Sequence, residues 1–464
     1  MHGAVRFDLD YTKCDPPLSL SAGRSEPSLF QDILETGKAK WLQNVKLLDQ
    51  ALIAASAGGR LESVRILLRF QHVYTDNTLQ TAIYFAAAEK KWSPVKELLD
   101  YVAENIAHDA RRAISLDDVF YLAAVSREDQ LDVLEKIWHL KSNSIPHDVL
   151  DFSVYQATVL KKTSTVIWLL DVCHASANAA SKPPSFLFSD HANIVPSQDF
   201  RNALNAAAGI GHSALVESLL SRGAQVNNDH AVALQLAASE GFAEIVHTVL
   251  LQGAIIDAIV PADAELNLKC GTALQAACDN GRLTVVETLL KHGANPNLGY
   301  RHNTPITSST QRPGPDVLKV LLDAPGIDIN VIDAETQSTP LIYAATNMPA
   351  DAVALLVRKG ANINAKNASG DTALIMAACK GDKACVEMLC CAGADVTYRS
   401  PRGLAIQVAA NELHPECAHV LAERMSGTIA DYLKQGKSSY NSSVDSRVVT
   451  DFRNSTRTRQ NTGA

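Results

Sequence analysis

The sequence predicts an all-α solenoid, in which short helix pairs stack side by side. Three observations favour this fold class. Threonines that open a repeated pattern recur at intervals of 32, 35 and 33 residues, at Thr272, Thr304, Thr339 and Thr372. In the clearest unit two apolar stripes with helical spacing follow the threonine, and Gly293 closes the second stripe. Two helices this short cannot bury both of their faces alone, so each pair needs a like neighbour.

Residues 271–297 show how one unit is expected to fold. Thr272 caps the first helix by accepting a hydrogen bond from a backbone N–H, and Gly281 follows as the chain turns. The second helix carries an apolar stripe made of Val285, Val286, Leu289 and Leu290. Gly293 then supplies the left-handed residue that ends a helix at least cost.

The stretch Thr272-Ala273-Leu274-Gln275-Ala276-Ala277, with Gly293-Ala294 at the end of the unit, resembles an ankyrin repeat. Its form is similar to that of the repeats in large fungal ankyrin arrays. The resemblance extends over about residues 46–435 and implies an ankyrin-repeat α-solenoid of ten to eleven repeats with a concave groove. In the family pattern a histidine ties neighbouring repeats by hydrogen bonding. Gln235 and Gln275 stand at that position here, and we expect them to substitute for it in part.

The rest of the chain divides by composition and by loss of the repeat period. We expect a flexible N-terminal arm at 1–27, capping helices at 28–45, diverged repeats at 46–172, an insertion at 173–199, regular repeats at 200–435 and a disordered tail at 436–464. Two alternatives stay open for the insertion. It either folds back on Trp168 or forms a mobile loop at a binding site.

Composition narrows the classes of function. The net charge of −8 and the pI near 6.0 argue against a protein that binds nucleic acid directly or adheres to anionic membranes. Neither a signal peptide nor an apolar run long enough to span a membrane is evident, so we expect a protein of the cytoplasm, the nucleus or both. Nine cysteines without a Cys-x-x-Cys pair fit a reducing compartment, where they act as small buried hydrophobes.

No catalytic motif stands out. Gly436-Lys437-Ser438 is similar to the end of a phosphate-binding loop, but Asp431 occupies the position of its first glycine. His414, Cys417 and His419 lack the second pair of ligands that a zinc site requires. We therefore expect no enzyme activity, no cofactor and no metal.

The resemblance implies a non-enzymatic scaffold or adaptor that binds a protein partner, with the chain itself a monomer. In the family, the hairpin tips and the ends of the first helices contact partners. The candidate partner-binding residues at those positions are Ser239, Glu240, Asp279, Asn280, Gln311, Arg312, Thr346, Asn347, Ala368, Ser369, Asp371, Lys380, Asn411 and Glu412. The alternative is an accessory or atypical catalytic protein of a small-molecule pathway, with a pocket near 173–199.

Overall fold

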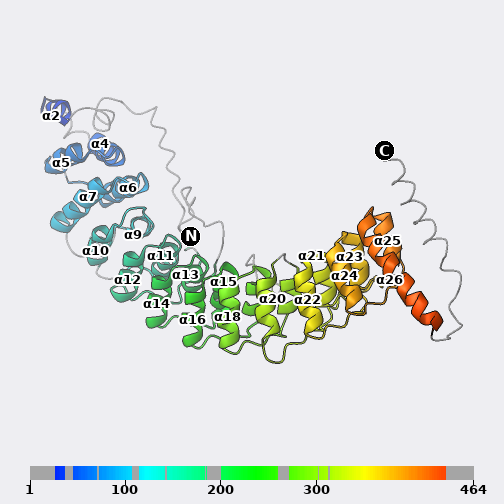
Figure 1. The fold of residues 1–464 in the computed structure, drawn as a ribbon. Coiled ribbons are helices and arrows are strands. Elements are labelled where there is room, and N and C mark those ends of the chain that lie inside the picture. Colours follow the sequence, from blue (N-terminus) through cyan, green and yellow to red (C-terminus); the bar gives the residue numbers. More distant parts are fainter. Residues whose placement is uncertain are drawn as a thin grey trace, which may run out of the picture. The chain divides into compact units, whose positions relative to one another are not determined.

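The computed structural model describes residues 27–36, 45–70, 73–106, 114–141, 144–182, 184, 200–259, 271–300, 303–311 and 314–434. Residues 1–26 of the arm predicted at 1–27, most of the insertion and the tail predicted at 436–464 lie outside these residues. The described chain falls into two units, Met1–Val226 and Asn227–Ala464. In both units the helices come in consecutive pairs, in which the first members form one row and the second members another (Figure 1). We call the first helix of each pair the inner helix and the second the outer helix.

Unit 1 begins with helix α2 (Pro27–Thr36), which packs on α5 and buries Phe30 and Leu34. Five pairs follow: α4 and α5 (Val45–Ala57, Leu61–Arg69), α6 and α7 (Asp76–Ala88, Trp92–Asn105), α9 and α10 (Asp117–Ala124, Leu131–Leu140), α11 and α12 (His147–Val159, Thr163–Asp171), and α13 and α14 (Ala203–Gly209, Ser213–Ser221).

Unit 2 opens with a short 3-10 helix η1 (Asn228–Ala231) and contains six pairs. They are α15 and α16 (Val232–Glu240, Ala243–Leu251), α17 and α18 (Ala273–Asp279, Leu283–Lys291), α19 and α20 (Pro305–Thr310, Pro315–Leu322), α21 and α22 (Pro340–Asn347, Ala350–Arg358), α23 and α24 (Ala373–Lys380, Lys383–Cys391), and α25 and α26 (Ala405–Asn411, Pro415–Lys434). Strands β1 (Arg399–Ser400) and β2 (Gly403–Leu404) pair antiparallel before α25. The described residues therefore hold eleven pairs, and the predicted all-α solenoid of ten to eleven repeats is confirmed.

The local signals of the repeat act as predicted. Thr272 Oγ1 accepts the backbone N–H of Gln275 at 3.1 Å and caps α17. Gly281 and Gly293 adopt left-handed φ values of 68° and 88° at the two turns of the unit. Val285, Val286 and Leu289 on α18 are fully buried, and Leu290 is half-buried. The stripe therefore faces the adjacent helices, as stacking requires.

The glutamines at the histidine position also behave as expected. Gln235 Nε2 donates to the carbonyl of Gly271 at 2.7 Å. Gln275 Oε1 accepts the N–H of Tyr300 at 3.0 Å. Each bond joins an inner helix to the loop that leads into the next repeat. One glutamine donates and the other accepts, and a side-chain amide can do both.

Asparagines link successive loops of unit 2. Asn227 Oδ1 accepts the N–H of Ile255 at 2.8 Å, while its Nδ2 donates to the carbonyl of Gly253 at 3.0 Å. Asn297 and Asn330 repeat both bonds two and three loops further on. We call this series the amide ladder. At its second position Asp257 accepts the N–H of Asn295, but a carboxylate has no proton to donate.

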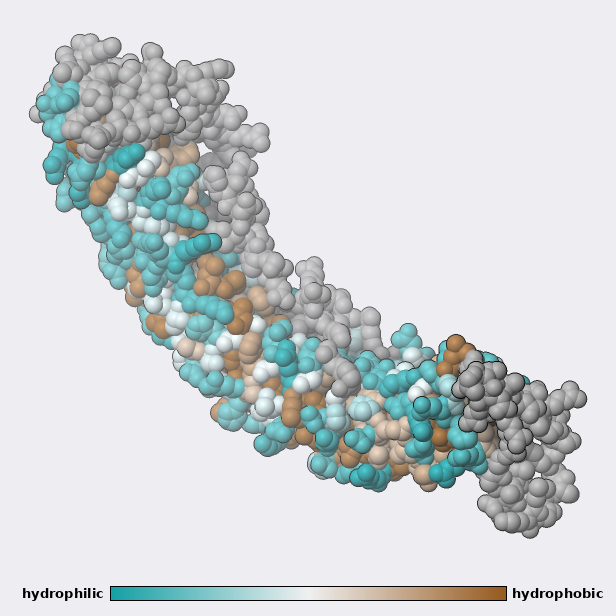
Figure 2. Space-filling model, turned by 45° about the horizontal axis from the view of Figure 1, so that its top comes forward, coloured by the Kyte–Doolittle hydropathy of each residue, from teal (hydrophilic) through white to brown (hydrophobic). Residues whose placement is uncertain are grey.

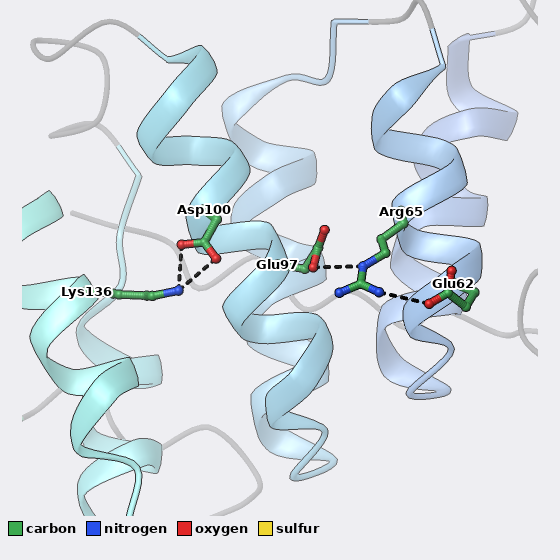
Figure 3. A network of polar contacts seen from close by, with 5 residues as sticks. All are labelled: Glu62, Arg65, Glu97, Asp100 and Lys136. Atoms are coloured by element: carbon green, nitrogen blue, oxygen red, sulfur yellow. Dashed lines mark hydrogen bonds and ion pairs between the residues drawn. The ribbon is translucent and has the colours of Figure 1, made fainter.

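Ion pairs link the outer helices of unit 1 (Figure 3). Arg65 on α5 contacts Glu97 on α7 at 3.1 Å, and Asp100 on α7 contacts Lys136 on α10 at 2.6 Å. Water screens each pair, so one pair alone contributes little, but the series favours one alignment of neighbouring helices. In Figure 2, hydrophilic residues predominate on the face in view and hydrophobic residues form separate patches.

Candidate functional site

Nine of the predicted partner-binding residues lie at the C-terminal ends of inner helices in unit 2. We call this set the turn surface: Ser239, Glu240, Asn280, Gln311, Thr346, Asn347, Lys380, Asn411 and Glu412. Six of them are exposed, and Ser239, Asn280 and Thr346 are half-buried. The repeat geometry thus brings residues about 30 to 40 positions apart in the sequence to the same place in successive helix pairs.

Hydrogen bonds between repeats hold this surface in place. Asn280 Nδ2 donates to Ser239 Oγ at 3.0 Å and to the carbonyl of Ala276 at 2.9 Å. Arg282 Nε donates to the carbonyl of Ser239 at 3.0 Å. Further along, Lys380 Nζ donates to the carbonyl of Met348 at 2.9 Å. Cations near the carbonyl ends of helices are favourable, because those ends carry partial negative charge.

The structure corrects two of the sequence-based assignments to the surface. Asp279 is only 8% exposed, because α17 packs between α15 and α19. Asp371 is 1% exposed, and its Oδ2 lies 3.1 Å from Nε of Arg402. Its backbone N–H donates to Oδ1 of Asn367 at 2.8 Å. Both aspartates are therefore parts of the framework and do not face solvent.

The other predicted residues are placed as follows. Ala368 and Ser369 are exposed in the loop before α23, where the N–H of Ala368 donates to the carbonyl of Thr336 at 2.8 Å. Gln311 Nε2 donates to Oδ1 of Asn303 at 3.2 Å. Arg312 lies outside the described residues.

Sequence reasoning missed a cluster around the β1–β2 hairpin. Lys366 Nζ stands 4.2 Å from the centre of the Tyr398 ring, and the Tyr398 hydroxyl donates to the carbonyl of Gly370 at 2.8 Å. Arg402 on the same hairpin reaches back to Asp371. The available signal was the run Tyr398-Arg399-Ser400-Pro401-Arg402, in which two arginines flank a turn-forming proline.

A second polar cluster surrounds the carboxylate of Asp333 in the loop before α21. Asp333 accepts from the hydroxyl of Tyr343 at 2.5 Å and from the backbone N–H groups of Glu335 and Thr336. Burial raises the pKa of Asp333, but these hydrogen bonds to the ionised carboxylate outweigh it, and the pKa lies below its usual 3.8. Burial and the bond to Asp333 both raise the pKa of Tyr343. The loop before α21 is thereby fixed with an ionised aspartate.

The described ends of the insertion are joined at their base. The N–H of Ser181 donates to the carbonyl of Arg201 at 2.9 Å, and the N–H of Ala203 donates to the carbonyl of Ala179 at 3.0 Å. Phe200 packs on Gly209 so closely that a Cβ there would lie 2.6 Å from the ring. Trp168 is half-buried, with its ring 6.3 Å from that of Phe120. The insertion at 173–199 was predicted to pack on Trp168, and its residues 185–199 lie outside the described chain.

The described residues contain neither a cluster of metal-binding side chains nor a membrane-spanning helix. No three side chains of His, Cys, Asp or Glu come together there in a way that would hold a metal ion. None of the described helices combines the length and the apolar character needed to cross a membrane.

Paired helices stacked by loop-to-loop amide bonds define a repeat solenoid. Residues 252–333 and 332–400 match the family model described as ankyrin repeats in three copies. The chain is an ankyrin repeat protein. The matching family is a repeat module and generally a protein-binding one, not a catalytic family.

Two curated proteins are similar over short stretches. The transient receptor potential cation channel subfamily A member 1 of Homo sapiens is 35% identical over 98 residues, which are 21% of this chain and 9% of that protein. Alpha-latrocrustotoxin-Lt1a of Latrodectus tredecimguttatus is 39% identical over 75 residues, which are 16% of this chain and 5% of that protein. The chain thus spans less than a tenth of the length of either relative.

Two solved structures are also similar. The human ASB11 ankyrin repeat domain has a TM-score of 0.42 and 26% identity, and the alignment covers 48% of this chain and 98% of that one. The ankyrin repeat domain of Bcl-3 has a TM-score of 0.40 and 25% identity, and the alignment covers 47% of this chain and 96% of that one.

Proposed function

We propose that this chain is a non-enzymatic scaffold or adaptor that binds a protein partner through the turn surface of unit 2. One observation carries the proposal. Exposed polar side chains end successive inner helices, as Glu240 and Asn347 do on α15 and α21. Glu240 makes an exposed ion pair of 3.9 Å with Arg282 of the next repeat, and water screens such a pair, so it contributes little to the packing. The identity of these exposed side chains is therefore free to serve recognition.

The hydrogen bonds beneath this surface support the same proposal. Asn280 to Ser239 and Lys380 to Met348 join side chains and backbone of adjacent repeats. A surface that is already ordered loses little conformational entropy when a partner docks. Binding affinity then depends on the exposed side chains and not on a folding step.

A reducing compartment, either the cytoplasm or the nucleus, is part of the proposal. The seven described cysteines are free thiols, and four of them are buried. Buried thiols that pack as small hydrophobes fit a compartment in which disulfides do not form.

The test compares two variants of the full chain. In the turn-surface variant, Glu240→Lys and Asn347→Lys change one acid and one neutral residue at the ends of inner helices. In the control variant, Glu387→Lys and Thr284→Lys make the same chemical changes at exposed positions on outer helices α24 and α18. Each chain is used as bait in a native cell extract, and bound proteins are quantified by mass spectrometry.

We expect proteins that bind the wild-type and control chains to be lost from the turn-surface variant, while all three chains melt at the same temperature. Recovery of the same proteins by the turn-surface variant would reject this surface as the binding site.

A variant in the core tests the packing of the repeats separately. Leu289→Ala should lower stability by about 2–5 kcal/mol, because it leaves a cavity in a fully buried position.

A further inference from the structure

Three neighbouring inner helices of unit 1 share one pattern of burial. On α6 the half-buried Tyr84 and Phe85 stand between buried pairs, 82–83 and 86–87. Tyr121 and Leu122 on α9 are likewise half-buried between buried residues, and so are Ile53 and Ala54 on α4. We call these six residues the apolar face of unit 1. Helix α6 packs against both α4 and α9, so the face is continuous from one helix to the next.

Aromatic rings give this face its chemistry. The rings of Tyr84 and Phe85 meet edge to face with centres 5.6 Å apart. Tyr121 stacks on Phe152 of α11 at 5.3 Å, and burial raises the pKa of its hydroxyl to about 12. Tyr121 is therefore neutral at physiological pH. Rings that are rigid and partly exposed make efficient contacts with apolar groups of a partner.

Three exposed cations border this face where the chain leaves the inner helices. Lys90 follows α6, Arg127 follows α9 and Lys161 follows α11. In the part of the chain that the structure describes, none of their side chains has an ion pair or a hydrogen bond. Glu89 and Glu128 share this border, so its positive excess is moderate. We call the three cations the basic edge.

The backbone at two of these cations is strained. Lys90 and Lys161 adopt left-handed φ values of 58° and 61°. The corresponding turns of other repeats hold glycine, as at Gly241 and Gly281, which adopts such values without a clash. A cation at the end of helix α9 does not require Lys161, because the adjacent Lys162 already provides one. Its Nζ donates to the carbonyl of Ala124, the last residue of α9, at 3.3 Å. Folding therefore does not account for these lysines.

The opposite border is acidic, and the fold accounts for it. Asp76 lies in the first turn of α6, and Asp117 and Asp118 lie in the first turn of α9. Acidic residues stabilise the N-terminal ends of helices, where partial positive charge collects. The fold thus explains the acidic border but not the basic edge, so we look for a binding partner at the basic edge.

We infer that the apolar face and the basic edge of unit 1 bind an acidic peptide segment of a partner protein. Its apolar side chains pack on the rings at 84, 85 and 121, and its carboxylates lie over Lys90, Arg127 and Lys161. The inference rests on the proposed function, that the chain binds protein, but it places the contact on a different surface. The chain's own stretch Phe7-Asp8-Leu9-Asp10-Tyr11 has the same chemistry and is the competing occupant.

The probe is a phage library of random 16-residue peptides selected on the full chain. Selected peptides are synthesised, and their affinities are measured by fluorescence anisotropy at low and at physiological salt. They are tested on the wild-type chain, on the variant Lys90→Gln with Arg127→Gln and Lys161→Gln, and on the turn-surface variant of unit 2. A further chain carries Lys90→Gly and Lys161→Gly, and another carries Asp8→Lys and Asp10→Lys.

We expect the selected peptides to be acidic and rich in apolar residues. Their affinity should fall at least about tenfold on the glutamine variant, because exposed ion pairs are lost, and should weaken with salt. The turn-surface variant should bind them as the wild-type chain does. On the glycine variant the melting temperature should rise while the affinity falls, whereas a purely structural role of the lysines would leave the affinity unchanged.

Four outcomes would overturn the inference. Peptides that are neutral or basic would reject the class of partner. Peptides lost only from the turn-surface variant would place binding on unit 2, which leaves the proposed function standing. No enriched peptide at all would show that the face does not take up peptides. A gain in affinity when Asp8 and Asp10 become lysine would assign the face to the chain's own segment.

Discussion

Asn330 in one loop of unit 2 is bonded to Asn362 in the next, with Oδ1 of Asn330 accepting the N–H of Asn362 at 2.7 Å. The Nδ2 of the same side chain donates to the carbonyl of Gly360 at 3.4 Å. One amide therefore satisfies a donor and an acceptor of the neighbouring loop. Asn and Gln carry the donor and the acceptor on two separate atoms of one amide, so both bonds form at once.

The first prediction removes that link. Asn330→Ala should lower the stability of the chain by about 1–2 kcal/mol, because two exposed hydrogen bonds are lost together. Thermal melting followed by circular dichroism measures the change. Asn411→Ala, at an exposed asparagine at the end of α25, is the control and should leave the melting temperature almost unchanged. Equal shifts for the two variants would show that the ladder does not stabilise the stack.

The second prediction completes the ladder. Asp257→Asn supplies the donor that the carboxylate lacks, and the new amide is placed to bond the carbonyl of Gly293 as Asn297 bonds that of Gly326. The chain should gain about 0.5–1.5 kcal/mol in stability. Asp328→Asn is the matched control, because Asp328 accepts only a local bond from Asn330. A loss of stability on Asp257→Asn would contradict the geometry.

The third prediction concerns the buried carboxylate of Asp371. Arg402→Met keeps most of the aliphatic stem but leaves Asp371 without its 3.1 Å partner. A buried charge without a partner should cost about 1–3 kcal/mol. Arg399→Met, on the same hairpin at an exposed position, is the control. If Asp371→Asn combined with Arg402→Met is no more stable than Arg402→Met alone, the carboxylate is not the cause.

The fourth prediction is a pH dependence. The pKa of Asp333 is lower in the folded chain than its usual 3.8, so the ionised form favours folding. This contribution is fully present above pH 3.8 and fades as the pH falls through the lower folded value. Asp333→Asn should therefore lower the melting temperature at pH 7 by more than at pH 3. A constant difference across that range would mean that the charge of Asp333 does not contribute.

Much of the fold was predictable from neighbouring residues in the sequence. The cap at Thr272, the turns at Gly281 and Gly293 and the buried Leu289 follow from spacings of three or four residues within one repeat. The bond from Gln235 to Gly271 was anticipated through the resemblance, because the family places a linking side chain there. The surface was harder to predict. Asp371 follows a loop glycine and precedes a capping threonine, a context that is typical of an exposed residue. Its ion pair with Arg402, 31 residues later, cannot be inferred from these neighbours.

What the sequence alone determined is the repeat: its length, its caps and the row of stacked helix pairs. These depend on backbone conformation and on apolar spacing, both of which are local. Only the tertiary structure decided that Asp279 and Asp371 are buried. It also decided that Tyr84, Phe85 and Tyr121 are partly exposed near cations that have no ion pair within the described residues. The physical reason is that exposure depends on which side chains of the adjacent repeats cover a residue, and those lie 30 or more positions away in the chain.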